Sequence, residues 1–228
     1  MIRILVLAAF LLSMLSTPAA AQSETIGPYV ILGATAGKAN NPRGRPEYKA
    51  DLGLELGGQI GLGYAYRALR LEAQAGYEAF FLDSLNPASG GSLYNVDGYG
   101  KVSGPVAMLN LFFRPGEPDS MNPFVGAGIG FANLNTKFKG DFCSVPLSAC
   151  FSNERIASGN ETVQAWQWVI GMSKMSRYKN SELFIGYRYF TTKDFSTNLA
   201  GYGPVTQDGV ESHSLMLAMR WYFGANGD

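Results

Sequence analysis

The sequence predicts an all-β fold, an eight-stranded antiparallel up-and-down barrel that spans a membrane as a transmembrane β-barrel. Apolar and polar residues alternate along many segments with the two-residue period of a strand. The connections between these segments are alternately short and long. Only 16% of the 228 residues are charged, whereas 28 are glycine and 13% are aromatic. A water-exposed surface needs more charge, so this composition favours contact with lipid.

The charge balance excludes a general affinity for nucleic acid. Lysine and arginine number 18, aspartate and glutamate also number 18, and the formal net charge is zero. A neutral chain creates no strong positive potential that would attract a polyanion from a distance. The length suits one domain, so we expect no nucleic-acid partner and a single barrel.

An export signal opens the chain. Arg3 precedes an apolar run and an alanine motif that ends at Ala21, as in a secretory signal peptide. This run is shorter than the roughly 20 residues that a membrane-spanning helix needs. We predict a signal peptide at 1–21 and a mature barrel domain at 22–228. Because Gln22 follows the predicted cleavage site, we expect no lipid anchor.

The strands follow from the alternation. In segment 52–66 the even positions are mostly leucine, isoleucine and tyrosine, and the odd positions are glycine, alanine or polar. Segment 69–81 alternates in the same way after a two-residue connection, which predicts a hairpin. Repeating this reading along the chain predicts eight strands. They span 29–36, 52–66, 69–81, 99–113, 123–132, 162–174, 182–190 and 212–223.

The connections predict how the barrel is oriented. The short ones are 67–68, 114–122 and 175–180, and the long ones are 37–51, 83–98, 133–161 and 191–211. Transmembrane barrels have short periplasmic turns and long external loops. An even number of strands then returns both ends of the chain to the periplasm.

A soluble barrel such as a lipocalin also alternates, so the polar face decides between the two. Most lysines lie outside the predicted strands, whose polar face carries glycine, alanine, serine, glutamine and a few charges of both signs. That face suits a crowded interior and not a wet exterior. Aromatic residues near strand ends fit interfacial girdles, namely Tyr64, Tyr66, Tyr187, Tyr189, Trp221 and Phe223.

Charged residues within the strands predict a plugged lumen. An arginine or lysine side chain that faces lipid at the bilayer midplane costs roughly 2–4 kcal/mol of stability. The charged side chains should therefore point inward. The interior of an eight-stranded barrel is just wide enough for side chains to fill. Strand direction predicts a periplasmic cluster of Arg70, Glu72, Glu182 and Arg220 and an outer cluster of Glu55, Glu78 and Arg188. Buried ion pairs are the favoured interpretation, and a gate or proton path is the alternative.

The sequence predicts no catalytic residues, no cofactor site and no metal site. The single histidine, His213, lies between Ser212 and Ser214. Neighbouring strand residues point to opposite faces, so this histidine cannot easily activate either serine. Glycine-rich segments lack the strand-to-helix context of a phosphate-binding loop. We therefore predict that the protein is not an enzyme.

The two cysteines, Cys143 and Cys150, suit an oxidising compartment and predict a disulfide. Both lie in the third long connection, between Phe142 and Phe151. We expect this pinned loop tip to offer Phe142 and Phe151 to a partner at the cell surface. The alternative is a loop that only shields the mouth of the barrel.

Several segments together resemble a known family. The export signal, the eight alternating strands, the motifs PFVGAG at 123–128 and GYRYF at 186–190, and the closing segment 215–223 are similar to small outer-membrane β-barrel proteins of the opacity-like porin family. Their shape is that of the outer membrane protein A transmembrane domain. The resemblance implies an integral protein of the bacterial outer membrane, surrounded by membrane lipid and lipopolysaccharide.

The last strand resembles the family's assembly signal, which the outer-membrane insertion machinery recognises. Trp221, Tyr222 and Phe223 would carry this signal. Phe223 is followed by five more residues, whereas the commonest form of the signal ends the chain.

The function that follows is a non-enzymatic barrel that presents long surface loops and has a plugged lumen. It would act as a structural or surface-interaction protein, of an adhesin-like or antigen-like kind, with a host molecule or an envelope component as ligand. The alternative is a diffusion pore for small solutes or ions.

Overall fold

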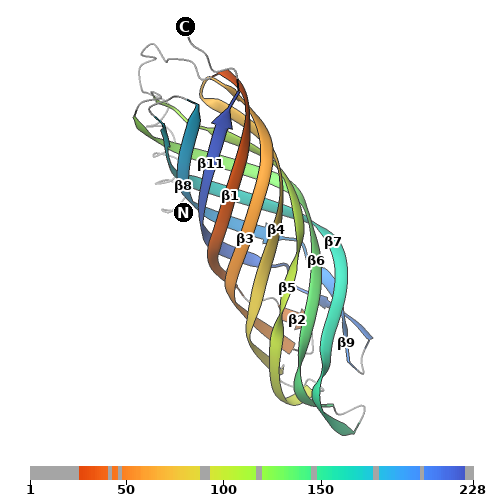
Figure 1. Ribbon diagram of the computed structural model, residues 1–228. Coiled ribbons are helices and arrows are strands. Elements are labelled where there is room, and N and C mark those ends of the chain that lie inside the picture. The colour runs from red at the N-terminus through yellow and green to blue at the C-terminus, as the bar shows by residue number, and fades with distance from the viewer. Residues whose placement is uncertain are drawn as a thin grey trace, which may run out of the picture.

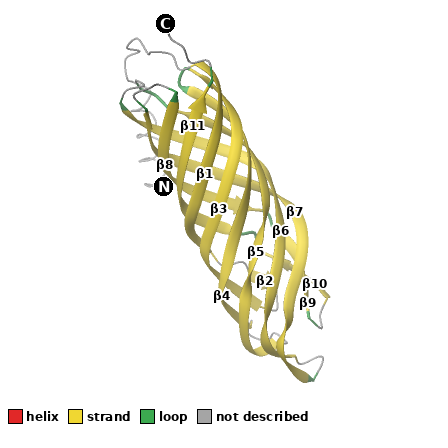
Figure 2. Cartoon of the chain, viewed as in Figure 1, coloured by secondary structure: helices red, strands yellow, loops and turns green. Residues whose placement is uncertain are grey.

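The computed structural model describes the chain from residue 26 to residue 223 with short gaps. The described ranges are 26–40, 43–45, 48–87, 93–116, 120–144, 148–176, 180–200 and 203–223. The predicted signal peptide lies outside them. No helix long and apolar enough to cross a membrane occurs in these ranges. They consist almost entirely of strands (Figure 2).

Eight long antiparallel strands form a closed ring, as predicted. β1 pairs with both β11 and β3, which joins the two ends of the sheet (Figure 1). The fold class predicted from the alternation is therefore confirmed. The strands are β1 (Ile26–Asn40), β3 (Tyr48–Tyr66), β4 (Leu69–Pro87), β5 (Leu93–Phe113), β6 (Met121–Ser144), β7 (Ala149–Met175), β8 (Ser181–Thr192) and β11 (Glu211–Tyr222).

Three short strands complete the wall at the end opposite the short turns. They are β2 (Arg43–Arg45), β9 (Phe195–Leu199) and β10 (Gly203–Gln207). β2 pairs with β3, β10 pairs with β2 and β9, and β9 pairs with β7. Together they connect β3 to β7 beyond the ends of β1, β8 and β11. We call this continuation of the wall the outer extension.

All the long strands except β11 are longer than predicted, because much of each predicted long loop belongs to the wall. The largest difference concerns 133–161, where β6 continues to Ser144 and β7 begins at Ala149. In the membrane part of β6 the outward residues are apolar, ending with Phe131. Beyond this point the outward residues are polar, while Leu134, Phe138 and Phe142 point inward. The two-residue alternation continues, but the apolar residues now lie on the inward face and the polar residues on the outward face. The many polar residues made the segment resemble a loop.

Between the short turns and the outer extension, the outer surface of the barrel is apolar, as a lipid-facing wall requires. Leu62 is 68% exposed, Leu215 is 64% exposed and Trp168 is 60% exposed. A surface in water would not leave a continuous belt of such side chains uncovered. Tyr64 and Tyr66 lie exposed near the short turns, as expected for an interfacial girdle.

In the outer extension the distribution is reversed, because the apolar side chains point to the interior. The core of this extension closes the outer mouth of the barrel with buried side chains from both halves of the ring. Among them are Leu52, Phe80, Leu85, Val102, Leu134, Phe138, Ile156, Phe190, Phe195 and Leu199.

The lumen is packed so tightly that one glycine makes room for a charged group. Gly57 on β3 lies beside Glu78, and a β-carbon at Gly57 would overlap both the Glu78 carboxylate and the Thr35 hydroxyl. The next residue, Gly58, is exposed, and nothing lies within 4 Å of the position that a β-carbon would take there. The two neighbouring glycines therefore differ only in the face that they occupy.

This difference gives a test of lumen packing. We expect Gly57→Ala to lower the free energy of unfolding by about 1–3 kcal/mol, because overpacking forces buried groups apart. Gly58→Ala is the matched control and should leave that free energy unchanged. Urea titration of the barrel refolded in lipid vesicles measures both. Equal effects of the two substitutions would contradict the assigned faces.

Candidate functional site

The lumen brings the predicted outer cluster together. Arg188 on β8 reaches across the barrel to Glu78 on β4 and Glu55 on β3. Its Nη1 lies 2.7 Å from Glu78 Oε1 and 3.5 Å from Glu55 Oε1. All three side chains are buried. We call Glu55, Glu78 and Arg188 the outer cluster.

Neutral polar groups hold the outer cluster in place. Arg188 Nε donates a hydrogen bond to Gln167 Oε1 at 2.8 Å, and Gln167 Nε2 donates to Asn110 Oδ1 at 2.5 Å. The Thr35 hydroxyl donates to Glu78 Oε2 at 3.3 Å. The Arg188 guanidinium also lies 4.6 Å from the centre of the Phe190 ring, within the range of a cation–π contact.

A second cluster lies nearer the short turns, and it contains the four residues predicted for the periplasmic end. Arg220 Nε lies 2.7 Å from Glu72 Oε1, and Arg220 Nη1 lies 3.4 Å from Glu182 Oε2. Arg70 Nε lies 3.5 Å from the same oxygen of Glu182. All four side chains are buried.

Sequence reasoning missed three members of this second cluster. Arg114 Nε lies 2.8 Å from Glu182 Oε1, although Arg114 was assigned to a turn. The Tyr29 hydroxyl donates to Glu72 Oε1 at 2.8 Å, and the Tyr222 hydroxyl donates to Glu182 Oε2 at 2.6 Å. The two-residue period could have found Arg114, which shares the inward face with Asn110 and Phe112. We call Arg70, Glu72, Arg114, Glu182 and Arg220, together with the hydroxyl groups of Tyr29 and Tyr222, the inner cluster.

An aromatic layer separates the two clusters along the barrel axis. It contains Phe112, Phe124 and Phe184, whose ring centres lie 5.0 to 6.4 Å apart. The Arg220 guanidinium lies 4.3 Å from the centre of the Phe184 ring. From the short turns outward, the lumen thus contains the inner cluster, an aromatic layer, the outer cluster and the apolar core of the outer extension.

His213 and its neighbouring serines lie on opposite faces of β11. Ser212 and Ser214 are buried toward the lumen, whereas His213 is exposed and contacts the Tyr187 hydroxyl through Nδ1. The structure therefore does not bring a histidine and a serine together here. Across the described ranges, no group of three or more histidine, cysteine or acidic residues is arranged to hold a metal ion.

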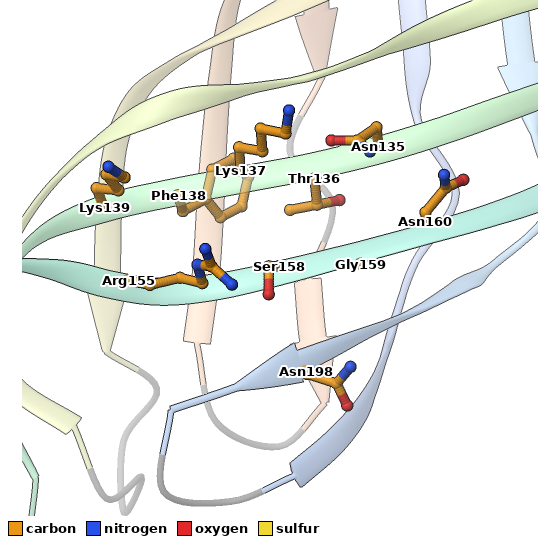
Figure 3. Close-up of a pocket in the computed structure, with 10 residues that line it drawn as sticks. All are labelled: Asn135, Thr136, Lys137, Phe138, Lys139, Arg155, Ser158, Gly159, Asn160 and Asn198. Atoms are coloured by element: carbon orange, nitrogen blue, oxygen red, sulfur yellow. The ribbon is translucent and has the colours of Figure 1, made fainter.

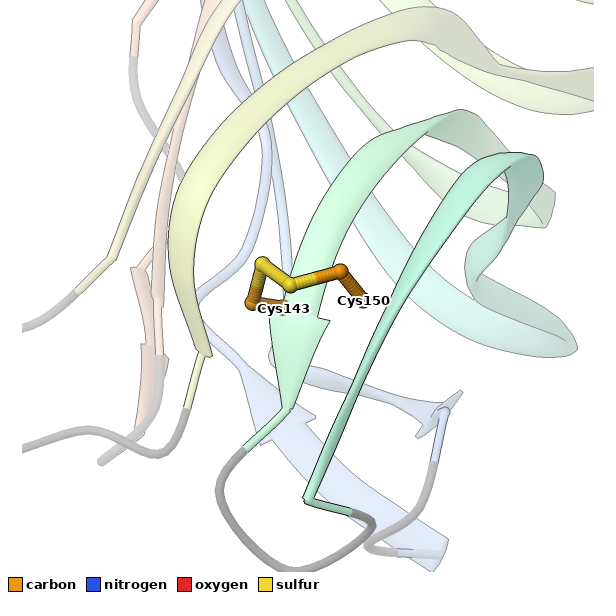
Figure 4. The surroundings of a disulfide bond; sticks show 2 residues. All are labelled: Cys143 and Cys150. Atoms are coloured by element: carbon orange, nitrogen blue, oxygen red, sulfur yellow. A yellow bond between two sulfur atoms is a disulfide. The ribbon is translucent and has the colours of Figure 1, made fainter.

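Cys143 and Cys150 form the predicted disulfide between facing positions of β6 and β7 (Figure 4). The prediction that Phe142 meets a surface ligand is wrong, because its side chain is only 3% exposed and belongs to the apolar core. Phe151 is half-buried, and its ring centre lies 5.2 Å from that of Phe142. Phe142 is buried because this segment is a pair of strands, in which every second side chain points inward.

The outer extension instead carries a basic hollow on its external wall, which sequence reasoning did not identify. Lys137 and Lys139 on β6 lie beside Arg155 on β7 (Figure 3). The hollow has a volume of about 320 Å³. Its other outward-facing residues are Asn135, Ser158, Asn160 and Asn198. The two-residue period of the sequence could have shown that Lys137 and Lys139 point outward. Their neighbours on β7 and β9 depend on how the strands pair, which the period does not give.

Comparisons with known proteins agree with this architecture. The family model described as "Outer membrane protein beta-barrel domain" matches residues 7–223. The structure of neisserial surface protein A has a TM-score of 0.53 and 16% identity, with 86% of this chain and 97% of that chain covered. OprG from Pseudomonas aeruginosa has a TM-score of 0.57 and 15% identity, with 87% and 97% covered. A comparison with curated protein sequences finds no significant match.

Both structures share a small outer-membrane barrel with this chain, and at these identities they bear on the fold alone. The family model, by contrast, spans nearly the whole sequence. The chain therefore belongs to the outer membrane protein β-barrel domain family and is an integral protein of the bacterial outer membrane.

Proposed function

We propose that this protein is a non-enzymatic surface-interaction scaffold with a closed lumen. The observation that carries the proposal is the order of packed layers along the barrel axis. Two ion-pair clusters alternate there with an aromatic layer and an apolar core. A scaffold of this kind holds its outer wall rigidly above the membrane. Its partners would be a host molecule or a component of the bacterial envelope.

The energetics of the clusters argue against the alternative, a diffusion pore for small solutes or ions. Opening the lumen would separate Arg188 from Glu78 and Arg220 from Glu72, each pair held at 2.7 Å. Breaking a buried pair leaves an uncompensated charge, at a cost of about 3–5 kcal/mol. The apolar core of the outer extension would also have to move aside.

The outer extension supplies the surface for interaction. Its wall is closed by paired strands, its interior is apolar, and the disulfide joins β6 to β7 near the tip. Such a wall keeps external side chains in fixed positions, and a preorganised surface loses little entropy on binding. The candidate contacts are therefore the outward polar residues of this wall, in place of Phe142.

We expect the mature chain to be silent in a planar lipid bilayer. Insertion would be checked independently by the altered gel mobility of the folded barrel before and after heating. Because packed layers fill the lumen, a bilayer that contains the protein should conduct no more than the lipid alone. Discrete and reproducible current steps from inserted, folded protein would instead favour the diffusion pore.

The outer cluster can be tested through stability. Arg188→Ala should lower the free energy of unfolding by about 3–5 kcal/mol, because Glu55 and Glu78 lose their buried cation. Lys38→Ala removes an exposed cation from β1 and should change it by less than about 0.5 kcal/mol. Urea titrations in lipid vesicles measure both.

A second variant separates charge from packing at this position. Combining Arg188→Met with Glu55→Gln and Glu78→Gln removes all three charges, and much of the lost stability should return. If this triple variant is as unstable as Arg188→Ala alone, the uncompensated charge is not the cause.

We further propose that Phe223 belongs to the signal read by the insertion machinery, as the resemblance of the last strand implies. Phe223 is 53% exposed on the lipid side, while Tyr222 is bound within the lumen. Phe223→Ser should therefore reduce the amount of barrel in the outer membrane of cells, yet leave refolding of the purified chain into vesicles intact. Equal losses in cells and in vesicles would assign Phe223 to folding alone.

A further inference from the structure

We propose that the external wall formed by β5, β6, β7 and β9 binds the phosphorylated sugars of lipopolysaccharide molecules that stand around the barrel. The site is the basic hollow together with Lys101 and Tyr99 on the adjacent strand β5. This inference rests on the proposed function and deepens it, because it names the envelope component and the part of the outer wall that binds it.

Four cations face each other directly across neighbouring strands. Lys101 on β5 is opposite Lys137 on β6, and Lys139 on β6 is opposite Arg155 on β7. All four side chains are exposed. The ion pairs identified among the described residues lie in the two lumen clusters, and none of them involves these four cations.

Like charges at facing positions of a sheet destabilise the strand pair. Two such pairs side by side place four positive charges on three adjacent strands of a chain whose net charge is zero. An anion between the facing cations removes this repulsion and gains charge-assisted hydrogen bonds. The arginine contributes a planar donor pair that suits phosphate oxygens, and the lysines contribute compact charges.

The remaining groups favour a sugar over a bare anion. Asn135, Ser158, Asn160 and Asn198 bring amide and hydroxyl groups to the hollow, and these can exchange hydrogen bonds with sugar hydroxyls. Tyr99 is 57% exposed and lies opposite Lys139. Its hydroxyl donates to Asn153 Oδ1 at 2.5 Å, which holds the aromatic ring across the wall.

Three exposed acids flank the site, namely Asp97 and Asp141 at facing positions of β5 and β6, and Glu154 next to Arg155 on β7. Of these, Asp141 is bound to β7. Its Oδ1 accepts hydrogen bonds from the Ser152 hydroxyl and the Asn153 backbone N–H, each at 2.8 Å. These two donors lower the pKa of the Asp141 carboxyl, so it remains ionised and bound to β7. The Asp141 carboxylate is therefore held against β7.

The height of the site identifies the source of the anion. Phe131 is the last apolar outward residue of β6, and Lys137 follows six positions later. Six strand residues span about 20 Å, or about 15 Å of height at the usual tilt. The site thus faces sideways, just above the lipid surface, where the phosphorylated sugars of lipopolysaccharide lie. A soluble polymer arriving from the medium would meet the tip of the barrel first.

Calorimetric titration of the refolded mature chain in detergent micelles tests the proposal. The probe is the phosphorylated core oligosaccharide released from lipopolysaccharide by removal of its acyl chains. The same oligosaccharide without phosphate and heparin, a sulfated polymer, are the comparison ligands. The test variant is Lys137→Gln with Lys139→Gln, and the matched control is Lys38→Gln with Lys174→Gln, which removes two exposed cations elsewhere on the wall.

We expect the phosphorylated oligosaccharide to bind the unmodified chain. Its Kd should rise roughly tenfold in the test variant, as expected for two surface charge contacts. The control variant should stay within about twofold of the unmodified chain, since its cations lie away from the hollow. Removal of phosphate from the probe should weaken binding at least as much as the test variant does.

Three results would overturn the proposal. The first is the lack of binding to the unmodified chain, and the second is an equal loss in the test and control variants. The third is stronger binding of heparin than of the phosphorylated oligosaccharide, which would assign the site to a sulfated polymer. None of these results depends on conductance, so they are distinguishable from failure of the proposed function.

Discussion

The structure depends on one constraint, that no strand within lipid can leave its backbone groups unpaired. β1 meets this constraint by pairing with β11 on one side and β3 on the other, which closes the ring. Closure at eight strands makes the lumen narrow, and the lipid outside drives the charged side chains into it. Arg188 and Arg220 must then find acidic partners across the barrel, and both do. The plug is therefore a consequence of the same constraint that builds the wall.

The constraint changes where the strands leave the membrane. β1, β8 and β11 end there, and β2, β9 and β10 take their places, so the ring remains closed. Water now surrounds the wall, and the apolar residues move to the inside, as Phe138 and Phe142 do on β6. The result is a water-facing barrel joined to a lipid-facing barrel through continuous strands. This arrangement gives the protein a rigid external surface that flexible loops would not provide.

Much of the lumen was predictable from the sequence, because the inward direction of a strand residue depends only on its phase. The seven charged residues expected inside are inside, in the two groups that strand direction indicated. Arg114 was missed because it is the first residue after the strand, which ends at Phe113 as predicted, and only residues within strands had been assigned a direction. Phe142 was misassigned because a segment rich in polar residues was interpreted as a loop, although its apolar residues kept the two-residue period on the other face.

The sequence by itself determined the number of long strands, their faces and the charges that enter the lumen. These properties are local, since each follows from side chains two residues apart. Only the tertiary structure decided which residues become neighbours across strands. The bridge from β3 to β7 through β2, β10 and β9 joins segments far apart in the chain. The facing of Lys139 and Arg155 likewise depends on register, which a bulge beside Phe138 shifts by one residue.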